Sequence, residues 1–141
     1  MKVRLLGILV VFALATVSLA QKPRQVDAFI AVDPTIVRVG ETVNIQVFVT
    51  NMGSKSITIR EIELYCGTKT HSIWEDFQTF KRVTVNPGEM RTLTTSYRVE
   101  CGDVPESECM GGWNLQAWIC FGGSGKTDLV TTEKTLFTVI P

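Results

Sequence analysis

The stretch that decides the fold is residues 41–66, ETVNIQVFVTNMGSKSITIREIELYC. In its first half, residues 42–50, valine and isoleucine alternate with threonine, asparagine and glutamine, and only Phe48 interrupts the polar side. A period of two with β-branched residues is typical of a strand that has one face in a core. A polar, glycine-containing link follows at residues 51–55, and a second strand starts beyond it.

The second strand changes phase once. Ile57 and Ile59 lie on one face, and after Arg60 and Glu61 the apolar alternation resumes one residue later, at Ile62, Leu64 and Cys66. A slip of one residue is the effect of a β-bulge, which inserts an extra residue into one strand of a pair. These two strands therefore predict the inner spine of a β-sandwich.

The first twenty residues differ from the rest. Lys2 and Arg4 accompany an apolar run that ends at Ser18-Leu19-Ala20, the pattern of a secretory signal peptide cleaved after Ala20. An uncleaved membrane anchor is the alternative, because the run is close to the length of a membrane span. The leader holds two of the 14 basic residues and none of the 14 acidic ones, so residues 21–141 carry a net charge of −2. We expect one secreted or surface domain over 21–141, with no nucleic-acid footprint and no later membrane span.

Further strands are indicated on both sides of the spine. A first strand, residues 26–39, is interrupted by proline at Asp33-Pro34-Thr35, which lets an edge strand change sheets. Strands are also expected at 83–85, 93–101, 113–121 and 128–140, with a turn at residues 86–89. Residues 67–81 have no clean period and predict a long crossover with a short strand in it. The chain shows no convincing helix, so the expected fold is an all-β antiparallel sandwich of about seven strands.

The turn residues resemble those of a known family. Pro34, Val39-Gly40-Glu41, the Asn51-Met52-Gly53 turn and Asn86-Pro87-Gly88-Glu89 look like the CARDB group of Ig-like extracellular modules. The resemblance covers residues 26–140 and implies a seven-stranded, fibronectin III-like sandwich with an adhesive or structural role. It implies no catalytic residues.

Four cysteines follow the leader, and export makes disulfides the first expectation for them. In an Ig-like sandwich Cys66, Cys101 and Cys109 lie at one end, whereas Cys120 lies about 20–25 Å away along its strand. We therefore expect one bridge among the first three, with Cys66–Cys109 preferred and Cys101–Cys109 second. Counting favours two bridges instead, which would require Cys120 to meet another cysteine, most simply Cys66.

The aromatic residues offer a second kind of site. Trp118 falls on the polar side of its strand, and with Trp74 it forms a candidate contact for a glycan or small ligand. The alternative, which we favour, is that residues 67–81 fold over this side and bury Trp118 against Trp74 or Phe77.

Other motifs are weak. Residues 122–127, GGSGKT, lack the first glycine and the following helix of a phosphate loop. His71, the only histidine, has no nucleophile signature beside it, and a zinc site of His71 with Cys66, Cys101 and Cys109 lacks paired spacing. The sequence thus predicts no enzyme, cofactor or metal. It favours a non-catalytic module that binds an extracellular or surface protein, with glycan binding as the alternative.

Overall fold

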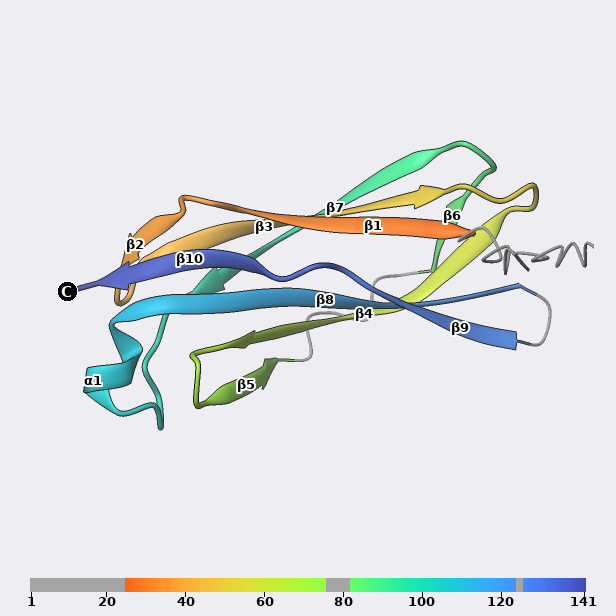
Figure 1. Ribbon diagram of the computed structural model, residues 1–141. Helices are drawn as coiled ribbons and strands as arrows, with labels where there is room; N and C mark the ends of the chain where they lie inside the picture. Colours follow the sequence, from red (N-terminus) through yellow and green to blue (C-terminus); the bar gives the residue numbers. More distant parts are fainter. Residues whose placement is uncertain (1–24, 76–81, 124–125) are drawn as a thin grey trace, which may run out of the picture.

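The computed structural model describes residues 25–75, 82–123 and 126–141, and these residues form two packed β-sheets (Figure 1). The predicted leader, 1–20, lies outside the described residues. In the part described, the only helix is one turn, α1 (Glu106–Cys109), and none is long and apolar enough to cross a membrane. The fold is all-β and Ig-like, as the alternation predicted.

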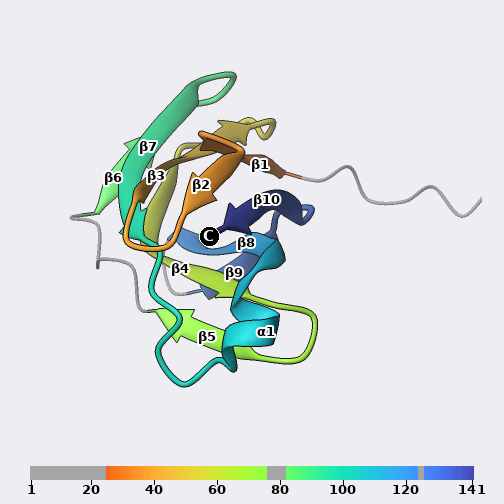
Figure 2. The ribbon, with the colours of Figure 1, turned by 90° about the vertical axis from the view of Figure 1, so that its left-hand side faces the viewer.

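The ten strand segments divide between a small and a large sheet. The three-stranded sheet has the order β1-β3-β7, and the large sheet has the order β2-β10-β8-β4-β5, with β6 paired to β4 and β9 paired to β8. Figure 2 shows the two layers from one end. The bounds are β1 (Val26–Asp33), β2 (Ile36–Arg38), β3 (Thr42–Asn51), β4 (Ile57–Gly67), β5 (Ser72–Glu75), β6 (Val83–Val85), β7 (Met90–Arg98), β8 (Gly111–Gly123), β9 (Lys126–Thr131) and β10 (Thr135–Ile140).

Strands β3 and β8 lie in opposite sheets and supply much of the core. On β3 every second side chain from Val43 to Asn51 is buried, and the polar residues between them face outward. On β8 the five residues Trp113, Leu115, Ala117, Ile119 and Phe121 are buried. The Trp113 ring contacts Tyr97 and Phe137 at centroid distances of 6.5 and 5.9 Å. Burial of these apolar faces is the main stabilising term, at about 25 cal/mol per Å².

The predicted β-bulge is confirmed at Arg60. Ile59 pairs with Phe121 and Glu61 pairs with Cys120, so Arg60 is the extra residue on β4. Because of this insertion, Ile59 and Ile62 both point into the core although they are three residues apart.

The proline break also acts as predicted. β1 pairs with β3 in the small sheet, and after the cis Asp33–Pro34 peptide β2 pairs in parallel with β10 in the large sheet. The chain thus changes sheets at Pro34.

Three segments differ from the expectation. β7 (Met90–Arg98) begins and ends three residues before the strand predicted at 93–101. The predicted strand 128–140 is divided, because the Thr132 hydroxyl accepts a hydrogen bond from the Ala117 amide, 3.0 Å, in place of a ladder bond. The loop 102–112 contains α1, whose single turn is too short to give a helical period in the sequence. With the strands expected at 26–39 and 128–140 each divided in two, and β5 as the short strand of the crossover, about seven strands become the ten described segments.

Candidate functional site

The disulfide lies at the α1 end of the sandwich and joins Cys101 to Cys109, with 5.4 Å between their Cα atoms. The preferred pairing of Cys66 with Cys109 is therefore wrong. Cys66 pairs in register with Leu115, four residues inside the start of β8 at Gly111. Cys66 therefore lies inside the large sheet, whereas Cys109 lies in α1, where its carbonyl accepts a hydrogen bond from Nε1 of Trp113. Cys66 is buried in the core instead.

A polar cluster lies beside this disulfide. Nδ1 of His71 is 2.7 Å from Oε2 of Glu108, and the Thr70 hydroxyl donates to the same carboxylate oxygen. These contacts hold the pKa of Glu108 below its ordinary value, with the Thr70 hydrogen bond as the largest cause and His71 next. The cluster ties the β4–β5 loop to α1. It does not form a hydrolytic triad, since the histidine and the hydroxyl both meet the carboxylate.

No group of three or more metal-ligating side chains is found within the described ranges. The zinc set considered from the sequence is ruled out, because Cys101 and Cys109 are consumed by the disulfide. The glycine-rich segment 122–127 joins β8 to β9, so a strand follows it where a phosphate loop needs a helix.

Trp118 and Trp74 lie on either side of β4 in the large sheet. Trp118 is opposite Glu63, and the backbone of Trp74 is opposite Tyr65. Two strand spacings and two residues separate their backbones, about 12 Å. Trp118 is half-buried, with its Nε1 3.5 Å from Oε1 of Gln116. The predicted burial of Trp118 against Phe77 involves a residue outside those described.

Cys120 lies on the same outer face as Trp118 and is a half-buried free thiol. It is opposite Glu61 on β4 and Leu129 on β9. Burial raises the pKa of the Cys120 thiol, and the charges of Glu61 and then Glu63 raise it further. This thiol therefore remains protonated and weakly nucleophilic at neutral pH.

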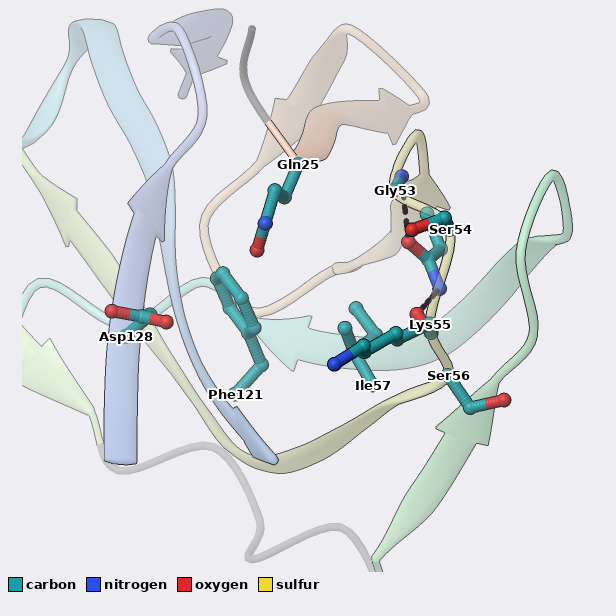
Figure 3. Close-up of a pocket in the computed structure, with 9 residues that line it drawn as sticks. Gln25, Gly53, Ser54, Lys55, Ser56, Ile57, Phe121 and Asp128 are labelled. Atoms are coloured by element: carbon teal, nitrogen blue, oxygen red, sulfur yellow. Dashed lines mark hydrogen bonds between the residues drawn. The ribbon is translucent and has the colours of Figure 1, made fainter. Parts of the chain in front are cut away.

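A hollow of about 390 Å³ opens at the other end of the sandwich (Figure 3). Gln25, Lys55 and Asp128 surround it, and Ile57 and Phe121 form its apolar floor. Its wall is fixed by Asn51, which is fully buried and receives a hydrogen bond from the Gly53 amide, 2.9 Å. Asn51 thus has a structural role here.

The outer face of the three-stranded sheet carries an aromatic pair that the sequence analysis did not assemble. Phe29 and Phe48 are cross-strand partners, and their rings stack with centroids 4.2 Å apart and planes at 9°. Phe29 is 50% exposed. The sequence feature that could have revealed the pair is that both phenylalanines alternate with the polar, outward-facing residues of their strands. Beside the pair lies a groove of about 290 Å³, lined by Ala31, Val32, Asp33, Asn44, Gln46 and Thr94.

The open edge of this sheet is β7, which pairs only with β3 among the described residues. The carbonyl of Glu89 accepts from Asn51, and the amide of Val99 donates to Glu41. Backbone groups alternate in direction along a strand, and the register from 90 to 98 is unbroken. The odd residues therefore face β3, while the N–H and C=O groups of the even residues, Met90 to Arg98, face the open edge.

A scan against protein-family models found no match, and a search of curated protein sequences found no significant match. Solved structures do share the fold. The CARDB domain of PF1109 from Pyrococcus furiosus, in complex with di-metal ions, is 13% identical with a TM-score of 0.51, over 82% of this chain and 87% of that one. Native alpha-2-macroglobulin from Escherichia coli, spanning MG7 to the C-terminus, is 19% identical with a TM-score of 0.56, over 82% and 16%.

A third similar structure is the alkylpurine DNA glycosylase AlkC of Pseudomonas fluorescens bound to DNA with an abasic site analog. It is 12% identical with a TM-score of 0.58, over 82% of this chain. This chain spans 30% of the glycosylase. The similarities establish an Ig-like fold, in which a CARDB domain is one of several neighbours. They carry no activity to this chain.

Proposed function

We propose that the protein is a non-catalytic extracellular module that binds another protein by adding a strand of its partner to the open edge of β7. The observation that carries this proposal is the length and composition of that edge. β7 has nine residues, and Thr92–Tyr97 contains no charge and no proline. An edge of this kind presents unpaired N–H and C=O groups to an incoming strand.

The other sheet edges are shorter or protected. β1 carries Asp27 and Asp33 and is followed directly by Pro34, all of which discourage strand addition. β2 and β6 have three residues each and β5 has four. This contrast supports β7 as the recognition edge.

Placement outside the cell is part of the proposal. It is supported by the leader pattern in residues 1–20 and by the Cys101–Cys109 disulfide, because such bonds persist in oxidising compartments.

The test is capture of partners from the secreted and surface fraction of the source cells, using the wild-type protein, Thr92→Pro and Thr92→Val. The backbone amide of Thr92 faces the open edge. Proline at this position therefore removes one outward N–H donor but none of the hydrogen bonds between β7 and β3, whereas valine retains the N–H donor. We expect the protein retained by wild type and Thr92→Val to be lost with Thr92→Pro. With that purified partner, amide hydrogen exchange of the even residues of β7 should slow. A partner that binds Thr92→Pro as well as wild type would contradict the use of this edge.

A ligand site at Trp118 and Trp74 is the second candidate, supported by their positions on either side of β4. Binding of a glycan that is lost in Trp118→Ala and retained in Leu129→Ala, which removes an exposed apolar side chain from the neighbouring strand, would favour it.

A further inference from the structure

We propose that the outer face of the three-stranded sheet binds a neutral oligosaccharide, which stacks on the Phe29–Phe48 pair and enters the adjacent groove. This site goes beyond the proposed protein-binding edge, since it uses the face of the sheet and not its open backbone groups.

The aromatic pair gives a fixed apolar platform. The two rings stack at 4.2 Å and 9°, so each restricts the rotation of the other. Half of the Phe29 surface nevertheless remains exposed to solvent, and Phe48 is partly exposed. The apolar C–H face of a pyranose ring is a suitable partner for such a surface, because it buries both apolar areas while its hydroxyl groups stay solvated.

The groove begins one register row beyond the platform. Ala31 is opposite Gln46, and Gln46 is opposite Thr94. The small Ala31 side chain lies between the larger Phe29 and Asp33 along the outer face of β1, and this difference in size leaves the hollow. Its volume of about 290 Å³ is near the lower limit of ordinary ligand sites, which suits one or two sugar rings.

The polar groups that line the groove match sugar hydroxyls. Asn44 and Gln46 each offer an amide donor and an acceptor, Asp33 offers carboxylate acceptors, and Thr94 offers a hydroxyl. Within the described part of the chain, no hydrogen bond engages these four side chains. They lie in two adjacent register rows, about 7 Å apart along the strands, so neighbouring hydroxyls of one saccharide can reach both rows.

Charge selects against anionic glycans. Asp27 and Asp33 lie at the two ends of the outer face of β1, and Arg98, opposite Thr42, is two residues beyond the row of Asp33 and Asn44. The Nε of Arg98 is 3.9 Å from Oε1 of Glu100, so a uronic acid or sulfate in the groove would meet the Asp33 carboxylate while this cation is paired elsewhere. A neutral saccharide avoids this repulsion.

The experiment is a screen of the purified protein against an array of neutral and anionic glycans, followed by titration calorimetry with the best neutral oligosaccharide. We expect Phe29→Ala and Gln46→Ala each to weaken binding about tenfold or more, as expected for loss of one stacking or hydrogen-bonding group. Phe29→Tyr, which keeps the ring, should bind within about twofold of wild type. Trp118→Ala and Leu129→Ala on the opposite sheet should leave the affinity unchanged.

Several results would overturn the proposal: no binding of any neutral glycan, binding of anionic glycans alone, or loss of binding in Trp118→Ala with retention in Phe29→Ala. If Phe29→Ala instead abolishes binding of a captured protein and no glycan binds, the face belongs to the protein interface. Thermal unfolding of each variant confirms its fold, and Phe29→Tyr separates a lost ring from a damaged sheet.

Discussion

Asn51 on β3 donates a hydrogen bond from Nδ2 to the backbone carbonyl of Val85 on β6, at 2.9 Å, and so links the two sheets through one side chain. The second Nδ2 hydrogen meets the Lys55 carbonyl at 2.8 Å, and Oδ1 accepts from the Gly53 amide. Asn51 has no exposed surface. Loss of any of these hydrogen bonds would be costly, because it would leave a buried polar group with neither a protein partner nor water to bond to.

Asn51→Ala should therefore destabilise the protein by about 2–4 kcal/mol, since it leaves two backbone carbonyls and one amide without their partner. Urea unfolding measures the change. Asn44→Ala, an exposed position on the outer face of the same strand, is the control and should change stability by less than about 0.5 kcal/mol. Equal effects of the two substitutions would show that the link between the sheets contributes little.

Reduction of the Cys101–Cys109 disulfide should cost about 2–3 kcal/mol, the chain-entropy value for a loop closed at a sequence separation of 8. Urea unfolding with and without reductant measures it, and Cys120→Ser should show the same difference because Cys120 is outside the bond. Non-reducing peptide mapping provides the direct check. A peptide joining Cys109 to Cys66 or Cys120 would contradict the pairing.

Most of the fold could be predicted from local patterns in the sequence. The phase slip at Arg60 predicted the bulge, and Pro34 predicted the change of sheet, because both are effects of a single residue on its own strand. The disulfide pairing could not be predicted from such local patterns. Whether Cys66 or Cys101 reaches Cys109 depends on how far β4 extends beside β8, and the register between strands far apart in sequence leaves no mark in either one alone.

The surface sites were harder to predict for the same reason. Phe48 was visible as an apolar residue on a polar face, but its partner Phe29 is 19 positions away and meets it only through the β1–β3 register. The open edge of β7 follows from the strand order of the whole sheet. Trp118 was correctly placed on the outer face, while its exposure depends on neighbouring segments.

Deletion of Arg60 should unfold the protein. Without the extra residue, β4 would keep one phase, so that either Ile57 and Ile59 or Ile62 and Leu64 would turn to solvent. Exposing two such side chains costs about 3–6 kcal/mol, a large part of the stability of a small domain. Circular dichroism and urea unfolding are the measurements, with Arg60→Ala as the control that keeps chain length. A deletion variant as stable as Arg60→Ala would show that the bulge is dispensable.

Cys120 should react slowly with iodoacetamide near neutral pH, because its raised pKa keeps the thiolate scarce. Replacing both Glu61 and Glu63 with glutamine should lower that pKa and speed the reaction, with the rate–pH profile moving to lower pH. Mass spectrometry assigns the alkylated residue. Asp128→Asn, which removes a charge on the adjacent strand β9, is the control and should leave the profile in place. An unchanged profile in the double variant would leave burial as the only cause.

Thr70→Val should raise the pKa of Glu108 toward its ordinary value of 4.5, since the Thr70 hydrogen bond is the largest cause of its depression. A carboxyl whose pKa is lower in the folded state stabilises the fold above its unfolded pKa, and this contribution is lost as the pH falls through the folded pKa. The free energy of unfolding of the wild type should therefore decrease as the pH falls below about 4.5, and that of Thr70→Val should decrease less over the same range. NMR titration of the Glu108 carboxyl and acid unfolding followed by tryptophan fluorescence provide the measurements. Glu106→Gln removes an exposed carboxyl from the same helical turn and should leave the Glu108 titration unchanged. A Glu108 pKa that is the same in wild type and Thr70→Val would contradict the assigned contact.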